Sequence, residues 1–251
     1  GDWLEYLHLR EDEDELKDDI NVLYEDDRII AISKPDFLPV TPTSKYYFNS
    51  LAILIKERYN VDFSPVHRLD IETSGVLLFG KDKKARNPIQ KLFRDHKVEK
   101  QYQAVTFNSP DTDSISGNLV PDEGSKIYTK LMLVAAEQAN SLTLIIRQEP
   151  WGIYSRVWVQ PITGKTNQIR AHLAAIGCPI VGDKKYYPDE DVFLDWFTYR
   201  DINRILPELK LNRQALHCES LSFINPFSGL KTTIIDQTSS WEKKISVLLL
   251  N

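Results

Sequence analysis

The sequence predicts an α+β fold with a mostly antiparallel, mixed β-sheet that is flanked by helices. Segments with the strand pattern outnumber those with the helix pattern, and neighbouring strands are often a short turn apart, which favours antiparallel pairing. No internal repeat, low-complexity linker or clear domain break follows residue 20. We therefore expect one domain over residues 20–251, which is long enough to form the core of an enzyme, preceded by an acidic leader over residues 1–19.

The expected strands are short apolar or alternating runs that are bounded by turn residues. Residues 76–79 are apolar throughout, and residues 99–107 alternate, so that Tyr102, Ala104 and Thr106 share one face. The expected strands cover residues 21–24, 28–33, 76–79, 99–107, 127–135, 141–148 and 154–160.

Four segments have apolar residues at helical spacing. The first covers residues 49–58, and the second covers residues 83–96 with a division near Pro88, because proline removes a helix hydrogen bond. The third covers residues 166–176 and stops at Gly177, and the last covers 239–250 after a serine cap.

Composition narrows the class of protein. No apolar run approaches the roughly 20 residues that a membrane-spanning helix needs, so no membrane association is expected. The beginning of the sequence is acidic, which is unlike a secretory signal, and two cysteines are too few for a disulfide framework or a four-cysteine zinc site. We expect a cytoplasmic protein that works as a monomer.

The charge distribution is uneven. The net charge is −5, which by itself argues against a nucleic-acid partner. However, residues 1–30 hold 12 Asp and Glu against three Lys and Arg, so the remainder has a net charge of +4. A modestly basic body with an acidic leader is compatible with RNA binding but does not require it.

The segment richest in chemistry runs from His67 to Gly75, with the sequence His-Arg-Leu-Asp-Ile-Glu-Thr-Ser-Gly, and it enters an apolar strand directly. A polar loop at the edge of a core places ionisable groups where burial and neighbouring charges alter their pKa values. The same residues also suit a simple turn that closes at Ser74 and Gly75, and from the loop alone the turn is the better interpretation.

This loop resembles the signature of the RluA-type pseudouridine synthase family, and the resemblance continues in order over roughly residues 20–230. In that family the aspartate of His-Arg-Leu-Asp is catalytic, no metal or organic cofactor is used, and the substrate is a ribosomal or transfer RNA stem-loop. The acidic leader stands where longer members carry an RNA-binding module, so the chain is similar to the compact branch. The other matching segments are Ile-Ser-Lys-Pro at 32–35, Glu-Lys-Gln-Tyr-Gln-Ala at 99–104, Gly-Lys-Thr-Asn-Gln-Ile-Arg-Ala-His-Leu at 164–173, Cys-Pro-Ile-Val-Gly-Asp at 178–183 and Ala-Leu-His at 215–217.

The resemblance implies a catalytic group of three residues. Asp70 is the catalytic carboxylate, Arg170 pairs with it and keeps it charged, and Tyr102 stacks on the uracil. Arg68 takes the place of the extruded base or grips its phosphate; otherwise it forms an ion pair with Glu72 or Asp62.

Lys34, Lys165 and Asn167 are expected to contact RNA phosphates, although each also suits a solvated surface position. At the position of Asn167, histidine is common in the family.

Two other functions remain open from the residues alone. A metal-dependent hydrolase is one, because His67, Asp70, His172 and His217 are acceptable zinc or iron ligands, although their spacing matches no metal motif. A non-catalytic RNA-binding protein is the other, and the presence of Asp70 together with Tyr102 and Arg170 disfavours it.

Overall fold

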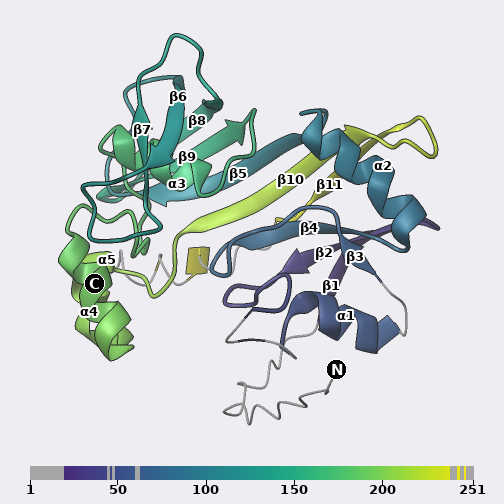
Figure 1. The fold of residues 1–251 in the computed structure, drawn as a ribbon, viewed down its shortest axis with the longest axis horizontal. Coiled ribbons are helices and arrows are strands. Elements are labelled where there is room, and N and C mark those ends of the chain that lie inside the picture. The colour runs from purple at the N-terminus through teal and green to yellow at the C-terminus, as the bar shows by residue number, and fades with distance from the viewer. Residues whose placement is uncertain are drawn as a thin grey trace, which may run out of the picture.

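A computed structural model describes residues 20–43, 46, 49–59, 63–237, 242, 243 and 246 of the chain. Its fold is α+β, as predicted: a mixed, mostly antiparallel sheet carries helices at its edges and on its faces (Figure 1). The strands are β1 (Asn21–Glu25), β2 (Ile29–Lys34), β3 (Ser64–Pro65), β4 (Ser74–Gly80), β5 (Glu99–Thr106), β6 (Ser114–Pro121), β7 (Leu131–Val134), β8 (Ser141–Trp151), β9 (Tyr154–Pro161), β10 (Leu216–Ile224) and β11 (Lys231–Ile235). The helices are α1 (Leu51–Tyr59), α2 (Lys83–Arg94), α3 (Gln168–Ala175), α4 (Glu190–Tyr199), the 3-10 helix η1 (Ile202–Arg204) and α5 (Leu206–Leu209).

The sheet has the strand order β1-β2-β4-β10-β5-β9-β8-β6-β7, with β3 beside β4 and β11 beside β10. Within the described residues, β4 and β10 are the one parallel pair. All seven residues of β4 are buried, as expected for a central strand with an apolar sequence. The loops that precede β4 and β10 therefore emerge at the same edge of the sheet.

Four details of the expected elements are corrected. Helix α2 continues through Pro88 without a division, because the missing hydrogen bond lies in its second turn and Ala85 and Ile89 anchor both sides in the core. Helix α3 begins at Gln168 instead of residue 166, because Asn167 adopts a left-handed conformation with φ 54°. The strand expected at 127–135 covers only Leu131–Val134, since the preceding residues form a turn that the Lys130 amide closes on Ile127. Strands β3, β6, β10 and β11, helices α4 and α5 and the 3-10 helix η1 were not predicted.

Two hydrophobic clusters lie in the described part of the chain. The main one fills the space between the sheet and its helices. A small one, formed by Val192, Ile205 and Leu209, holds α4, η1 and α5 together as a lobe at one end of the molecule (Figure 1). In the described residues no helix is both long and apolar enough to cross a bilayer. The acidic leader and nearly all of the helix expected at 239–250 lie outside the described residues.

Candidate active site

Two glycines allow the loops of the site to approach one another. At Gly75, where φ is +113°, a Cβ atom would lie 2.2 Å from the Cys218 carbonyl oxygen, so only glycine lets β4 meet β10 this closely. At Gly182, where φ is +80°, a Cβ would lie 1.8 Å from the carbonyl oxygen of Arg213. These contacts bring together the loop before β4, the segment after α3 and the start of β10.

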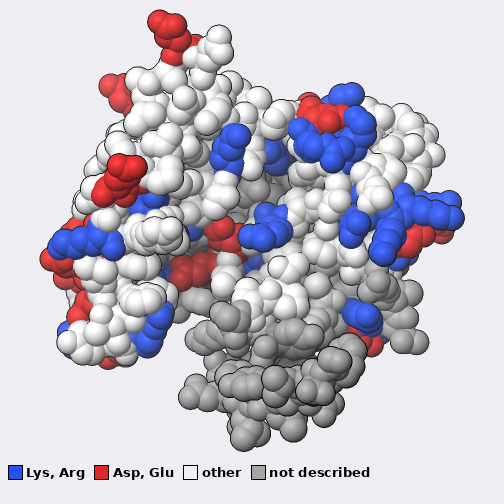
Figure 2. Space-filling view, in the orientation of Figure 1, with Lys and Arg blue, Asp and Glu red and all other residues white. Residues whose placement is uncertain are grey.

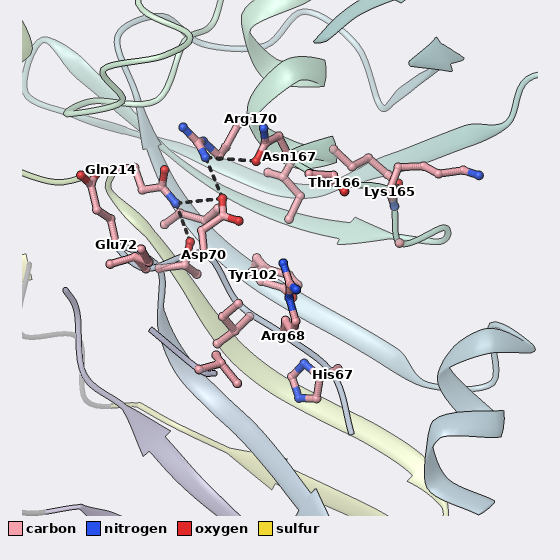
Figure 3. A pocket seen from close by; sticks show the side chains of 18 of the residues that line it. His67, Arg68, Asp70, Glu72, Tyr102, Lys165, Thr166, Asn167, Arg170 and Gln214 are labelled. Carbon is pink, nitrogen blue, oxygen red and sulfur yellow. Dashed lines mark hydrogen bonds and ion pairs between the residues drawn. The ribbon is translucent and has the colours of Figure 1, made fainter. Parts of the chain in front are cut away.

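Asp70 lies at the centre of this junction, in the loop before β4. Its Oδ2 accepts a hydrogen bond from Arg170 Nη1 at 2.7 Å and another from Gln214 Nε2 at 3.4 Å (Figure 3). Its backbone carbonyl accepts from the Thr73 amide, which closes the turn that holds the loop. Within the described residues, Oδ1 has no hydrogen-bond partner, and the side chain is 38% exposed. One carboxylate oxygen is therefore held by the protein, and the other is available to a ligand.

The charge of Asp70 is stabilised by its neighbours. Burial alone would raise its pKa, but the positive charge of Arg170, the hydrogen bonds from Arg170 and Gln214 and the charge of Lys185 together lower the pKa below its ordinary value. Asp70 is accordingly ionised at neutral pH.

Arg170 is fixed by a second carboxylate. Its Nε and Nη2 donate to the two oxygens of Asp183 at 2.6 and 2.8 Å, a bidentate geometry, and the Asp183 side chain is fully buried. Burial opposes the charge of Arg170, but the carboxylates of Asp183 and Asp70 outweigh it and raise the pKa of the guanidinium. The Tyr186 ring lies 5.3 Å from the guanidinium carbon. Arg170 therefore holds one orientation, with Nη1 directed at Asp70.

Asp70 opens into a cavity of about 1080 Å³, which exceeds the volume of most small-ligand pockets. Figure 2 shows it as a hollow near the middle of the face in view, with acidic and basic side chains inside it. Tyr102, Arg68, Lys165 and Asn167 line it.

These four residues differ in their freedom. Tyr102 is only 9% exposed, and burial, followed by its contact with Cys218, raises its pKa well above the ordinary value, so the phenol is neutral. Arg68 and Lys165 are exposed at the cavity. Among the described residues Arg68 has no ion pair, so the alternative pair with Glu72 is not found, and Asp62, the other alternative partner, lies outside the described residues. Asn167 accepts from Arg170 Nη1 at 3.2 Å and so also orients that side chain.

Lys34 does not lie where a phosphate contact requires it. Its side chain is completely buried, and its Nζ donates to the carbonyl oxygens of Pro35 and Ile71 at 2.7 and 3.0 Å. Burial and the charge of Arg213 lower its pKa to about 7, although nearby carboxylates oppose this shift. The expectation that Lys34 contacts RNA is wrong. The lysine instead anchors the loop beside Asp70, because an extended apolar strand carries it under that loop.

The histidines do not form a metal site. His67 stacks on Phe93 with ring centroids 4.6 Å apart and accepts from the Leu78 amide, His172 Nε2 is 2.9 Å from Ser141 Oγ, and His217 Nδ1 is 2.9 Å from Ser74 Oγ. Within the described chain, no three His, Cys, Asp or Glu side chains are arranged to hold a metal ion. The structure therefore does not support the metal-dependent hydrolase.

The sequence did not single out three residues that hold the site together. Gln214 donates to Asp70 and to Thr73 Oγ1, Asp183 fixes Arg170, and Lys184 donates to Glu72 in the Asp70 loop at 2.6 Å. A signal existed for Asp183, since an acid that follows an apolar run and a glycine lies at the edge of a core. Gln214 has no comparable signal, because its role depends on the packing of β10 against β4.

Comparison with known proteins places this geometry in a family. Residues 28–175 match the model of the RNA pseudouridylate synthase family. The dual-specificity RNA pseudouridine synthase RluA of Pasteurella multocida is 30% identical over 212 residues, covering 83% of this chain and 89% of that protein. The ribosomal large subunit pseudouridine synthase C of Rickettsia bellii is 33% identical, over 79% of this chain and 67% of that protein.

A solved structure shares the whole architecture. Human RNA Pseudouridylate Synthase Domain Containing 4 superposes with a TM-score of 0.63 at 26% identity, over 92% of this chain and 93% of that one. The family match spans more than half of the chain, and the similarity to the two bacterial enzymes extends over most of it. The chain is therefore a member of the RNA pseudouridylate synthase family, of the RluA type.

Proposed function

We propose that this protein isomerises specific uridines in RNA to pseudouridine, with Asp70 as the catalytic residue. The observation that carries the proposal is an ionised carboxylate, held at one oxygen by Arg170 and Gln214 and open at the other to a large cavity. The alternatives of a metal-dependent hydrolase and of a non-catalytic RNA-binding protein have no support in the site or in the relatives.

The chemistry needs a charged carboxylate. Pseudouridine formation breaks the bond from ribose to the uracil nitrogen, turns the base and rejoins it through carbon. Attack on the sugar carbon, addition to the base and removal of a sugar proton each begin from ionised Asp70, whose pKa its neighbours lower. The base must leave its stack to reach the cavity, which costs a few kcal/mol and least in an unpaired loop.

The other cavity residues then have assigned tasks. Tyr102, buried and neutral, supports the everted base within the cavity, and Arg68 at the cavity mouth contacts the RNA from which the base has left. Arg170 and Asp183 keep the carboxylate in one position throughout the reaction. Lys165 is exposed at the cavity and Asn167 lines it beside Arg170, and we expect a backbone phosphate to contact both (Figure 3).

Helix α2 supplies a basic surface for RNA beside the cavity. The helix carries five Lys and Arg and no Asp or Glu, although the net charge of the chain is −5. Its last residue, Arg94, lines the cavity, and the basic side chains over α2 lie on the same face as the hollow (Figure 2). Lys84 and Lys91, seven residues apart, share one exposed side of the helix with Arg94.

The proposal is tested by chemical mapping of pseudouridine in total cellular RNA, with and without the protein. We expect a small set of uridines in ribosomal or transfer RNA to lose their modification without the protein and to regain it with the wild-type chain. Asp70→Asn, supplied at the same level, restores none of them. A modification pattern that is identical in all three samples contradicts the proposed function.

The α2 surface makes a separate prediction about salt dependence. If Lys84 and Lys91 contact phosphates, the double variant Lys84→Gln and Lys91→Gln lowers the slope of log affinity against log salt by about 1.4 to 1.8. The measurement is fluorescence anisotropy of a labelled RNA hairpin between 50 and 200 mM salt. The matched control neutralises two lysines away from the cavity, Lys210→Gln and Lys231→Gln, and leaves the slope unchanged. Equal slopes for both double variants contradict an RNA contact at α2.

The remaining predictions concern setting and substrate. A stem-loop of ribosomal or transfer RNA is the proposed substrate, and the name of the Rickettsia bellii enzyme, a ribosomal large subunit pseudouridine synthase, supports the ribosomal part. The protein acts as a monomer in the cytoplasm and needs no cofactor. The domain division at residue 20 also stays a prediction, because the leader lies outside the described residues.

A further inference from the structure

Helix α4 presents an aromatic surface that the site described above does not use. Phe193, Trp196, Phe197 and Arg200 are spaced three and four residues apart, so they occupy one side of the helix. Phe193 and Trp196 line the same cavity as Asp70. Phe197 continues the surface outward and is 55% exposed. The four residues are called the α4 face below.

The side chains of the α4 face already contact one another. The rings of Phe193 and Phe197 are stacked, with centres 6.1 Å apart and an angle of 19° between their planes, and the rings of Phe193 and Trp196 are tilted by 55° with centres 5.6 Å apart. Arg200 ends the helix in a left-handed conformation, with φ 55°, and its guanidinium carbon lies 4.4 Å from the Phe197 ring centre and 4.9 Å from that of Trp196. Flat groups are thus preorganised at the edge of the cavity, which lowers the entropy cost of binding a further flat group.

The charges around the α4 face favour an anionic ligand. The carboxylates of the helix are engaged elsewhere: Glu190 with Lys130, Asp191 with Lys126, and Asp195 with Arg204. Arg200 has no ion pair among the described residues, and its contacts are with aromatic rings. An arginine stacked on aromatic rings and free to pair with phosphate is a typical contact for unpaired RNA.

The α4 face also connects to the Asp70 loop. Lys184 Nζ lies 5.5 Å from the Trp196 ring centre, and the same amine donates to Glu72, two residues after Asp70. A ligand on the α4 face therefore lies beside Lys184, which holds the loop that carries Asp70.

We propose that the α4 face is a stacking platform for an unpaired base that neighbours the target uridine in the substrate RNA. This rests on the proposed function and adds a specificity element to it. Eversion of the uridine leaves the adjacent base without its stacking partner, and the α4 face replaces that partner. The platform selects targets whose neighbours are unpaired, since a paired neighbour cannot turn its face to the protein.

The test combines protein and RNA substitutions. The protein variant is Phe193→Leu with Phe197→Leu, which keeps the apolar character but removes both rings, and Phe197 is exposed enough for the lobe to fold around Val192, Ile205 and Leu209. The RNA is a hairpin with a uridine in its loop, chosen by mapping or, where mapping finds no target, by its affinity for the protein, and a series of hairpins carries a single abasic residue at each position beside that uridine. The dissociation constant is measured by anisotropy and the pseudouridine yield by a single-turnover assay.

With the intact hairpin, the double variant binds about tenfold more weakly than the wild type. At one neighbouring position, the abasic hairpin weakens the wild type by a similar factor but leaves the double variant almost unaffected, because the base and the rings belong to one contact. Phe197→Trp, which retains a ring, binds like the wild type. Additive losses at every position overturn the platform.

Tyr199→Leu is the matched control. Tyr199 is on the same helix, is 60% exposed and also has an arginine over its ring, Arg204 at 4.2 Å, but it does not line the cavity. Its variant binds all hairpins like the wild type. The double variant could instead keep its RNA affinity and alter the oligomeric state of the protein, measured as the mass of the particle in solution. In that case the α4 face is an interface between copies and the proposal is wrong. Failure of the proposed function is recognised separately, because the wild type then forms no pseudouridine at any hairpin while the binding measurements still judge the platform.

Discussion

Asp70→Asn lowers the single-turnover rate of pseudouridine formation by at least about 10³-fold, a loss within the range that one catalytic proton-transfer or nucleophilic group supplies. The amide has the same shape and still accepts hydrogen bonds from Arg170 and Gln214 through its oxygen. It lacks the negative charge, and every route for the reaction begins from that charge. We therefore expect RNA affinity within about threefold of the wild type, and the measurement is the rate on a hairpin substrate beside its dissociation constant.

A neighbouring carboxylate provides the control. Glu72 lies two residues away in the same loop. It forms an ion pair with Lys184 and accepts a hydrogen bond from the backbone N–H of Gln214 at 3.1 Å. Glu72→Gln disturbs the loop without removing the charge at Asp70, so its loss in rate is at least tenfold smaller. An Asp70→Asn protein with the wild-type rate, or with a loss no greater than that of Glu72→Gln, shows that Asp70 is not the catalytic residue.

Arg170→Met produces the second large effect, on stability as well as activity. Removal of the guanidinium leaves the Asp183 carboxylate fully buried without its counter-charge. Loss of one partner of a buried ion pair costs about 3–5 kcal/mol of unfolding free energy, which corresponds to a fall in Tm of roughly 10 °C for a chain of this size. Thermal unfolding followed by circular dichroism measures the change.

The same variant shifts the pH dependence of the remaining activity. In the wild type, the pKa of Asp70 lies below its ordinary value, so the carboxylate stays ionised as the pH falls towards 4 and its stabilising charge contact is lost only below that. Without Arg170, the guanidinium charge no longer opposes the effect of burial, and the pKa of Asp70 rises. As the pH is lowered, activity is therefore lost at a higher pH than in the wild type. A pH profile of the single-turnover rate between pH 4 and 8 measures this shift.

A second substitution separates the two roles of Arg170. In the double variant Arg170→Met with Asp183→Asn, the buried group is neutral, and its oxygen still accepts from the backbone amides of Lys185 and Tyr186. Most of the lost stability returns, whereas the rate stays low because Asp70 still lacks its partner. Recovery of the full rate together with stability indicates that Arg170 acts only as a structural residue.

The sequence by itself determined the α+β class, the strands β2, β4, β5 and β9 and the identity of the family, but not the central strand β10. A short apolar run such as residues 76–79, which ends at Gly80, indicates a buried strand, and a motif such as His-Arg-Leu-Asp is local, so both can be recognised without the fold. The predicted proximity of Asp70 and Arg170 was correct, although it came from the family resemblance, because 100 residues separate the two in the chain.

Only the tertiary structure decided which polar residues meet. Lys34 looked like a surface cation and proved to be buried beneath the Asp70 loop, while Gln214 and Asp183 entered the site through the close approaches at Gly75 and Gly182. The α4 face likewise became significant only when its lobe was found beside the cavity. The physical reason is that a side chain's local sequence sets its backbone conformation, whereas its pKa, its burial and its partners depend on segments that are distant in the chain and adjacent only after folding.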